Sequence, residues 1–344
     1  MIVRFANEHE IKKWNSLILA NPDGGNIFSS YEYAMQKETG GYKAYFILVD
    51  DLAVTVLEKN VSGLGKLWYL PKGPNITSSK ELLEALESLG QFAKKHGVFT
   101  IRIESEINRN EKSFLEKKGL IKARPIVPNP STITLDISDD IEKILLDLPQ
   151  KGRYAIRRAE RDGVIIKQVE SNEDNCKLMY NLLSETAEGQ FGIRNYSYFK
   201  TFWKRFEKAG LGQLFFAYHE NRLVAGAYAM SFGQKSTYKD GASVRKRTVY
   251  GASHLLQWKI IEWAKTRGVV LHDLCGSPPS EEINNTQHKH YGVGLFKTGF
   301  SKSVTDYIGC YDFIINQTKY KLWVKIGEKI VHRIHYYKHH DSYF

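Results

Sequence analysis

The sequence predicts a mixed α/β fold arranged as two domains, on three observations. The chain has 344 residues, which is more than one hydrophobic core ordinarily serves. Apolar residues make up 42% of it and only nine residues are proline, as in compact globular proteins. Strand-like and helix-like stretches alternate, and their order begins again from Lys151. We therefore expect two similar mixed α/β domains.

In the first half, apolar residues that alternate predict strands, and apolar spacings of three and four predict helices. Asp50-Asp51 is expected to form a hairpin turn, and Ser29 or Ser30 to cap a helix that carries Lys37. The expected strands are 2–5, 44–49, 52–58, 68–70, 98–104 and 132–137, and the expected helices include 78–95 and 113–118.

The second half repeats this order. Its last expected helix, 253–267, has Ser253 as a candidate N-cap and stops at Gly268. The other expected helices are 139–148, 174–188 and 196–207, and the expected strands are 164–169, 214–219, 223–232, 236–240 and 269–274. The expected domains are therefore residues 1–147 and 148–316, with the tail 317–344 counted with the first.

The tail from Gln317 onward is expected to form one long helix. Apolar residues follow helical spacing through Trp323, Ile326, Ile330 and Ile334, and cations lie elsewhere around the helix, at Lys319, Lys325, Lys329 and Arg333. Two interpretations stay open. The helix packs back on the first domain, or it is a basic helix that lies on a membrane surface.

Charge and cysteine content limit the kinds of partner and the cellular compartment that we expect. The net charge is +11 and the pI is about 9.2, which favours an anionic partner such as nucleic acid, a phosphorylated substrate or a membrane face. Cys176, Cys275 and Cys310 show no CxxC spacing, and the histidines lack a third nearby ligand, so neither a disulfide framework nor a metal site is expected. With no run of 18 apolar residues and no signal-peptide core, we expect a soluble cytoplasmic protein.

The stretch Tyr291–Phe300 holds the strongest candidate for chemistry. Gly292, Gly294 and Gly299 border the pair Phe296-Lys297, and glycine lets backbone approach a ligand closely. A lysine held there becomes a fixed cation, or an amine of depressed pKa if it is buried. The alternative is a glycine-bordered strand whose lysine faces solvent.

Three further groups of residues suit anions. Arg153, Arg157 and Arg161 recur every four residues, so a helix would align them for phosphate contacts, unless they form a solvated face. Arg194 and Tyr198 have the same spacing and suit a phosphate or carboxylate. Glu104 ends an expected strand, where an acid faces either a cleft or solvent.

The turn that opens the helix at 253 differs from the pyrophosphate-binding turn of acetyl-CoA-dependent N-acyltransferases. Aligned on Gly251, the sequence has Thr248 and Ser253 where those enzymes have Gln or Arg and Gly or Ala. This departure counts against coenzyme A, and no cofactor is expected.

Taken together, these motifs resemble the FemABX family of aminoacyl-tRNA-dependent peptidyltransferases, which add bridge amino acids to peptidoglycan precursors. The resemblance is strongest over Leu148–Asp312 and includes Asp273-Leu-Cys-Gly276 and Gly292-Val-Gly-Leu-Phe-Lys297. It implies two acetyltransferase-like (GNAT-type) domains, with the C-terminal helix returning to the first. Between Glu188 and Leu214 there is no room for the long coiled-coil arm of some members, so the chain resembles the short, armless type.

The resemblance also implies roles for six residues. Lys297 takes the place of the catalytic lysine, and Phe296 that of the aromatic residue that meets the terminal nucleotide of the tRNA. Glu104 occupies an aspartate position considered as a base. The residues that would hold the precursor are Arg194, Tyr198 and Lys37.

The leading expectation is therefore an aminoacyltransferase with aminoacyl-tRNA as co-substrate. Its acceptor would be a peptidoglycan precursor, either a UDP-MurNAc-peptide or a lipid-linked form, with peripheral contact to the inner membrane face. An acyl-CoA-dependent N-acyltransferase is the first alternative, and a non-catalytic RNA-binding module is the second. The amino acid transferred and the oligomeric state stay open.

Overall fold

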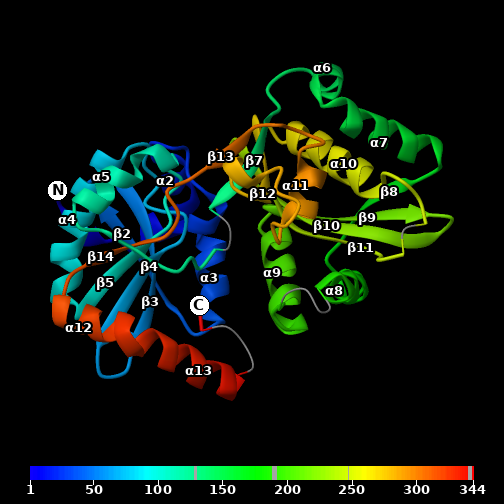
Figure 1. The fold of residues 1–344 in the computed structure, drawn as a ribbon. Coiled ribbons are helices and arrows are strands. Elements are labelled where there is room, and N and C mark those ends of the chain that lie inside the picture. Colours follow the sequence, from blue (N-terminus) through cyan, green and yellow to red (C-terminus); the bar gives the residue numbers. More distant parts are fainter. Residues whose placement is uncertain (128–129, 188–191, 247, 340–342) are drawn as a thin grey trace. The chain divides into compact units, whose positions relative to one another are not determined.

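The structure is a computed structural model that describes residues 1–127, 130–187, 192–246, 248–339 and 343–344 (Figure 1). The chain forms two compact units. The first comprises Met1–Pro130 and Asp306–Phe344, and the second comprises Ser131–Thr305. Each unit is built on one mixed sheet with helices against it, so the expected α/β class is confirmed.

Among the described residues, the first unit holds a seven-stranded sheet in the order β1-β2-β3-β4-β5-β14-β6. The β4/β5 pair is parallel, and the other neighbours are antiparallel. The hairpin expected at Asp50-Asp51 joins β2 to β3. The strands are β1 (Val3–Phe5), β2 (Lys43–Val49), β3 (Leu52–Val61), β4 (Gly65–Leu70), β5 (Val98–Ile103), β6 (Ile121–Lys122) and β14 (Tyr311–Ile314).

Helix α4 (Ser79–Lys95) covers part of this sheet with its apolar face. Ser78 caps it by accepting a hydrogen bond from the backbone N–H of Glu81, and its leucines enter the core of the unit. Ser30 caps α3 (Tyr31–Glu38) in the same way, as expected. The other helices before the second unit are α1 (Glu8–Lys12), α2 (Trp14–Leu19) and α5 (Lys112–Lys117), with 3₁₀ turns at Ile27–Ser29 and Arg109–Glu111.

The described part of the second unit also holds a seven-stranded sheet, in the order β13-β7-β12-β11-β10-β9-β8. Its β11/β12 pair is parallel, while β7/β12, β10/β11, β9/β10 and β8/β9 are antiparallel. The strands are β7 (Ser131–Asp136), β8 (Ile165–Val169), β9 (Gly212–His219), β10 (Arg222–Phe232), β11 (Lys235–Ser243), β12 (Leu271–Gly276) and β13 (Val304–Asp306).

Helices lie on both faces of the second sheet (Figure 1). Helices α7 (Gln150–Arg161) and α10 (Ala252–Thr266) pack together on one face, and α8 (Glu173–Ala187) and α9 (Tyr196–Lys208) on the other. The remaining helices are α6 (Ile141–Asp147) and α11 (Tyr291–Lys297), with a 3₁₀ turn at Ser280–Glu282. The core under α10 is formed by large side chains such as Leu256, Ile260 and Ile261.

The division of the chain differs from the expected boundaries at 147/148 and 316/317, and strand pairing is the reason. β7 was assigned to the first domain, but it pairs with β12 in the second sheet. β14 was assigned to the second domain, but it pairs with β5 and β6 in the first sheet. Both pairings join residues far apart in sequence, which local patterns do not reveal.

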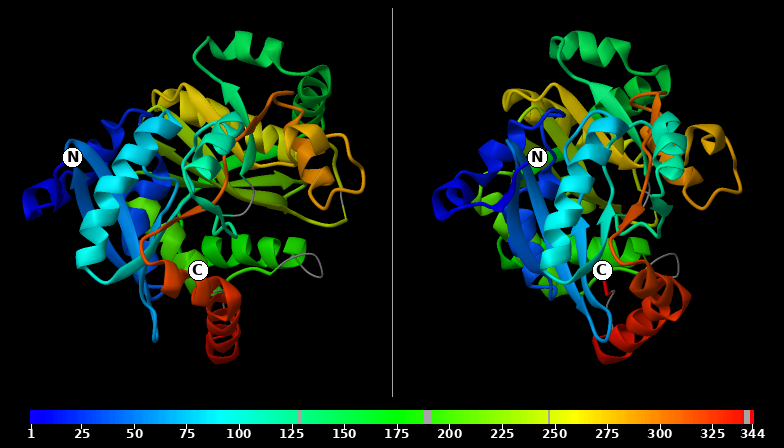
Figure 2. Two further views of the ribbon diagram at one scale, coloured as in Figure 1. Left: turned by 60° about the vertical axis from the view of Figure 1, so that its left-hand side comes forward. Right: turned by 90° about the vertical axis from the view of Figure 1, so that its left-hand side faces the viewer.

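The tail forms the expected long helical segment, drawn in red in Figures 1 and 2. It consists of α12 (Gln317–Leu322), a π-helical turn at Trp323–Gly327 and α13 (Glu328–His339). In the part of the chain that the structure describes, no helix is long and apolar enough to cross a membrane.

Two local expectations are wrong. Tyr291–Lys297 is the helix α11 and not a glycine-bordered strand, and neither Gly292 nor Gly294 adopts a positive φ. Ser253 is not the N-cap of α10, because the helix begins one residue earlier, after Gly251. Gly251 has φ of 80°, and an added Cβ would lie 2.1 Å from the carbonyl oxygen of Ala155 on α7. Only glycine allows α7 and α10 to approach this closely.

Candidate active site

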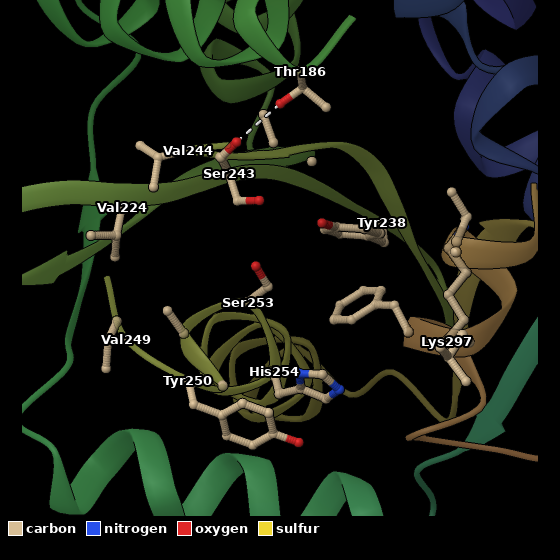
Figure 3. Close-up of a pocket in the computed structure, with 18 of the residues that line it drawn as sticks. Thr186, Val224, Tyr238, Ser243, Val244, Val249, Tyr250, Ser253, His254 and Lys297 are labelled. Atoms are coloured by element: carbon tan, nitrogen blue, oxygen red, sulfur yellow. Dashed lines mark hydrogen bonds between the residues drawn. The ribbon is translucent and has the colours of Figure 1, made fainter. Parts of the chain in front are cut away.

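A cavity of about 530 Å³ opens in the second unit, lined by the end of β11, the start of α10 and the helix α11. Figure 3 shows Tyr238 and Ser243 on the strand side, Ser253 and His254 on the helix side, and Lys297 at one end. The strand wall is fixed in part by Thr186 of α8, whose hydroxyl donates to the carbonyl oxygen of Ser243 at 3.2 Å. Phe296 and Lys297, the adjacent pair singled out in the sequence, both line this cavity.

Lys297 is the last residue of α11 and is 6% exposed. Its Nζ donates hydrogen bonds to the backbone carbonyl oxygens of Cys275, at 2.9 Å, and Gly276, at 2.7 Å. Burial lowers the pKa of this lysine, because a desolvated ammonium is costly. The interpretation with a solvent-facing lysine is therefore wrong, and the depressed-pKa interpretation agrees with the structure.

The backbone carbonyl groups that accept hydrogen bonds from Lys297 lie in a turn at the end of β12, and Asp273 of the same strand stabilises this turn. Cys275 adopts a φ of 60°, which is unusual for a residue other than glycine. The carboxylate of Asp273 accepts a hydrogen bond from the backbone N–H of Cys275 at 2.7 Å and another from the hydroxyl of Thr132 on β7. Asp273 therefore stabilises the turn that aims the two carbonyl groups at Lys297.

Phe296 packs between the two walls. Its ring centroid lies 4.9 Å from that of His254 on α10 and 6.5 Å from that of Tyr238 on β11. The ring lines the cavity and is partly buried against the core of the unit. An aromatic face at the edge of a cavity suits stacking on a nucleotide base.

A second lysine, Lys239 of β11, lines the same cavity. Burial lowers its pKa, but neighbouring groups raise it, chiefly the carboxylate of Asp240 at 2.9 Å from its Nζ, and the net effect is a raised pKa. Asp240 also accepts from the indole N–H of Trp203 on α9 at 3.0 Å. The cavity thus holds two lysines whose pKa values are shifted in opposite directions, which suits one fixed cation and one adjustable amine.

Arg194 and Tyr198 lie beside this region, at the start of α9. The guanidinium carbon of Arg194 lies 4.8 Å from the centre of the Tyr198 ring, so the structure brings this pair together as the spacing predicted. The pair does not line the cavity itself. The Tyr198 ring stacks on that of Phe202, with centroids 6.3 Å apart, and the Nζ of Lys239 lies 5.2 Å from the centre of the Phe202 ring, which links the pair to the cavity.

Lys37 and Glu104 belong to the first unit. Lys37, on α3, is buried with its Nζ 5.1 Å from the centre of the Tyr42 ring. Glu104 is buried just after β5 and accepts from the hydroxyl of Tyr69 and from the backbone N–H of Ile126 at 2.7 Å. Burial raises the pKa of Glu104, so it is not a solvated acid at a strand end.

The basic row at 151–161 does form a helix, α7, but its arginines differ in use. Arg153 donates to the carbonyl oxygens of Leu146 and Leu148 and so holds the end of α6. Arg157 and Arg161 are exposed, and Arg158 pairs with Asp162 at 2.6 Å. The row therefore offers two exposed guanidinium groups rather than three aligned ones.

Metal binding has no support in the described residues, where no group of three His, Cys, Asp or Glu side chains is placed to hold an ion. The start of α10, in contrast, is suited to bind an anion. Its first turn, with Ala252 and Ser253, lines the cavity, and the first N–H groups of a helix have no acceptor within the helix.

The sequence model of the FemAB family matches residues 127–220 and 210–326 of this chain, which is more than half of it. The chain belongs to the FemAB family. The resemblance predicted from sequence motifs is thereby confirmed.

Curated relatives of this FemAB-family chain include proteins named Lipid II:glycine glycyltransferase. The protein from Staphylococcus epidermidis is 22% identical over 406 aligned positions, covering 92% of this chain and 94% of its own length. That from Staphylococcus aureus is 22% identical, with the same coverage. Because the alignment is longer than this chain of 344 residues, the relatives carry residues that this chain lacks. That agrees with the short, armless type.

Solved structures agree on the fold. The crystal structure of FemX has a TM-score of 0.79 at 19% identity and covers 94% of this chain and 99% of that one. The structure of L-PGS from Bacillus licheniformis has a TM-score of 0.54 at 13% identity, with 95% and 99% covered. These likenesses show the fold of the FemAB-family chain.

Sequence reasoning missed two lining residues of the cavity in this FemAB-family chain, Lys239 and Tyr238, and the role of Asp273 behind its wall. Lys239 and Tyr238 were placed in a strand without a role, and Asp273 was used only as part of a motif. The signal that could have found Lys239 is its place next to Asp240 within a strand whose start, at Ser236 and Thr237, is buried. A cation and an acid side by side in such a strand need each other's charge.

Proposed function

We propose that this protein is an aminoacyltransferase that moves an amino acid from aminoacyl-tRNA to the stem-peptide amine of a peptidoglycan precursor. The observation that carries the proposal is Lys297, a buried lysine at the end of a cavity in a member of the FemAB family. The names of the relatives support the substrate class, because a Lipid II:glycine glycyltransferase takes Lipid II as acceptor and transfers glycine.

The proposed reaction joins an amine to an activated ester. The acceptor amine, as a neutral nucleophile, attacks the ester carbonyl carbon and creates a tetrahedral oxyanion. The C–O bond to the tRNA ribose then breaks, the amide remains, and the amine proton leaves to the ribose oxygen or to solvent. The ammonium of Lys297 would stabilise the oxyanion, which is worth roughly 3 kcal/mol by analogy with one oxyanion-hole donor.

The remaining groups would bind the anionic parts of the substrates. Phe296 offers a ring for the terminal base of the tRNA, and the first turn of α10 offers N–H groups for phosphate. Lys239 supplies a cation that Asp240 keeps charged. Arg194 and Tyr198, with Lys37 and Glu104 of the first unit, stay candidates for the precursor. We place the reaction in the cytoplasm, where charged tRNA is available.

One observation favours a second candidate, an acyl-CoA-dependent N-acyltransferase. The same helix start that suits a tRNA phosphate also suits a pyrophosphate, and it opens on the cavity. Titration calorimetry with coenzyme A separates the two, because micromolar binding would favour the N-acyltransferase.

The direct test incubates the protein with charged tRNA, glycyl-tRNA first, and with UDP-linked and lipid-linked precursor in parallel. Mass spectrometry then follows the gain of one amino acid. Lys297→Met should reduce turnover about a hundredfold, since roughly 3 kcal/mol of barrier is involved. A matched control is Lys302→Met, because Lys302 is exposed and only five residues away.

Two outcomes would reject the proposal. If Lys297→Met keeps turnover within about threefold of wild type, which is about 0.7 kcal/mol, then Lys297 is not catalytic. If no precursor is modified in any assay while RNA binds with steep salt dependence, a non-catalytic RNA-binding module is the better description. Arg157→Ala with Arg161→Ala would then weaken RNA binding, as both side chains are exposed.

A further inference from the structure

The helical tail carries a row of exposed apolar side chains that the proposed reaction does not use. We call it the outward stripe and define it as Leu322, Ile326, Ile330, Ile334 and Tyr337. Each of these side chains is between 47% and 71% exposed, and the first four recur every four residues. Spacing of four places side chains on one face of a helix. A continuous row of this kind is unusual on the surface of a protein that has no partner there.

Side chains on the opposite face of the tail make contacts within the first unit. Trp323 is completely buried, with its ring 6.0 Å from that of Phe99 on β5. Glu328 pairs with the buried Arg102 at 2.8 Å. The C-terminal Phe344 packs on His332, with ring centroids 5.1 Å apart. The tail is therefore anchored by one face, and the outward stripe is the face that this anchoring leaves uncovered.

The charges around the outward stripe have one sign. Between residues 317 and 339 there are six lysines and arginines and one acid, Glu328. That acid is turned inward to Arg102. Lys325, Lys329 and Arg333 each precede a stripe isoleucine by one position and are exposed. An apolar row bordered by cations is complementary to a surface with an apolar interior and anionic headgroups.

We propose that the outward stripe docks this protein on the surface of an anionic lipid bilayer. The helix lies in the interface plane and does not span the bilayer, since no described helix is long and apolar enough to do so. The isoleucines enter the boundary between headgroups and acyl chains, and the flanking cations contact lipid phosphate groups.

A second copy of this chain is a poorer occupant of the stripe. In a two-fold contact the same patch faces itself, so the lysine and arginine row of one copy would lie against that of the other. The one acid of the segment is already paired with Arg102 inside the unit. An anionic surface removes this repulsion, whereas self-association increases it.

This inference does not depend on the proposed reaction, because it rests on exposure and charge in the first unit alone. It adds a location to that reaction: a protein docked by its tail would meet a lipid-linked acceptor at the membrane surface. A nucleotide-linked acceptor would need no such docking.

The test is sedimentation of the full-length protein with vesicles. Vesicles of phosphatidylcholine with about 30% phosphatidylglycerol should bind it at least about tenfold more tightly than pure phosphatidylcholine, and salt should weaken the binding. The triple variant Ile326→Ser/Ile330→Ser/Ile334→Ser should lose at least about tenfold in affinity for the anionic vesicles. The triple variant Lys325→Glu/Lys329→Glu/Arg333→Glu should lose as much.

Matched controls change the same chemistry elsewhere. Leu146→Ser removes an exposed apolar side chain from α6, and Lys94→Glu/Lys95→Glu reverses two exposed charges at the end of α4. Both should bind anionic vesicles within about threefold of wild type. Circular dichroism and thermal unfolding verify that every variant is folded.

Three results would overturn the inference. The first is wild-type protein that binds neither kind of vesicle. The second is a serine variant that is folded and binds anionic vesicles as tightly as wild type. The third is a wild-type dimer in analytical ultracentrifugation that the serine variant abolishes, without vesicle binding, because the stripe would then join two copies. Transfer activity on a UDP-linked acceptor is measured separately, so loss of either proposal leaves the other standing.

Discussion

The Nζ of Lys297 lies 2.7 Å from the carbonyl oxygen of Gly276, so the buried ammonium rests against the backbone at the end of β12. A charge held in this way depends on the shape of the chain around Gly276. The same segment includes Cys275, whose positive φ is stabilised by Asp273. The properties of the lysine are therefore set by residues that need not touch a substrate.

Asp273 is accordingly expected to be a positioning residue. Asp273→Asn should reduce kcat about tenfold and change KM little, because the asparagine oxygen accepts the N–H of Cys275 more weakly than a carboxylate. Asp136→Asn is the matched control, since Asp136 accepts from the N–H of Ser138 at 2.8 Å in the same local arrangement but on the surface. Steady-state kinetics that change equally in both variants would contradict the positioning role.

The charge of Lys297 predicts a pH dependence. Burial lowers its pKa below the ordinary value of 10.5, so the ammonium is lost at a lower pH than in an ordinary lysine. If the ammonium is the active form, wild-type activity should fall at high pH relative to Lys297→Arg, whose guanidinium stays charged. The ratio of the two rates across alkaline pH is the measurement, because the acceptor amine affects both enzymes equally. A ratio that does not change with pH would exclude this role.

Lys239 is expected to act in binding rather than in the chemical step. Lys239→Met should raise KM about tenfold, or about 1.4 kcal/mol, and leave kcat within about threefold. Lys235→Met, on the same strand but outside the cavity lining, is the control. A large fall in kcat with an unchanged KM would place Lys239 in catalysis instead. Thermal unfolding should accompany the kinetics, because the variant leaves Asp240 without the ammonium 2.9 Å away.

His272 predicts a loss of stability in mild acid. Burial lowers its pKa from 6.5 to about 3, and the imidazole contacts Ser236 at 2.7 Å and Gln257 at 2.6 Å. As pH falls below 6.5 the unfolded chain gains a proton that the native imidazole does not take. Because of this group, the free energy of unfolding should be about 2 kcal/mol lower at pH 5 than at neutral pH.

The variant His272→Gln tests this contribution by urea unfolding at pH 7 and pH 5. It should be less stable than wild type at neutral pH, since buried hydrogen bonds change, but its stability should fall less between the two conditions. Equal falls in wild type and variant would mean that other groups cause the acid sensitivity.

The close approach of Gly152 to the turn after α11 leaves no room for a side chain at position 152. A Cβ added there would lie 1.8 Å from the carbonyl oxygen of Gly299, in the turn after Lys297. Gly152→Ala should therefore destabilise the protein by about 3 kcal/mol. Gly292→Ala is the contrast, because its Cβ would meet open space within α11, and it should stabilise the helix by up to about 1 kcal/mol. Denaturant titration of both variants decides the matter.

Element type was predictable where the pattern is local. The strands 44–49 and 52–58 and the helix 78–95 follow directly from alternation and from leucine spacing. The helix α11 was not predictable in this way, because two glycines lower its intrinsic helix propensity. Its position is fixed instead by packing, since a Cβ on Gly294 would lie 2.9 Å from the ring of Pro278.

The site was predictable only in part for the same reason. Lys297 and Phe296 could be singled out because they stand in a glycine-bordered motif. For Lys239 the only local signal is an acid beside it in a strand, and nothing local shows that β11 ends at a cavity. That cavity exists because Gly251 brings α10 against α7 and because α11 returns to the end of β12, and both contacts join distant segments.

Strand β14 follows the second unit in the chain but belongs to the sheet of the first unit, and this order has a consequence for biosynthesis. A ribosome releases residues 131–305 before residues 311–314, so the second unit has all its strands while the first sheet still lacks the one between β5 and β6. The edges of β5 and β6 that pair with β14 therefore stay unpaired until β14 is synthesised, and the sheet of the first unit is completed last.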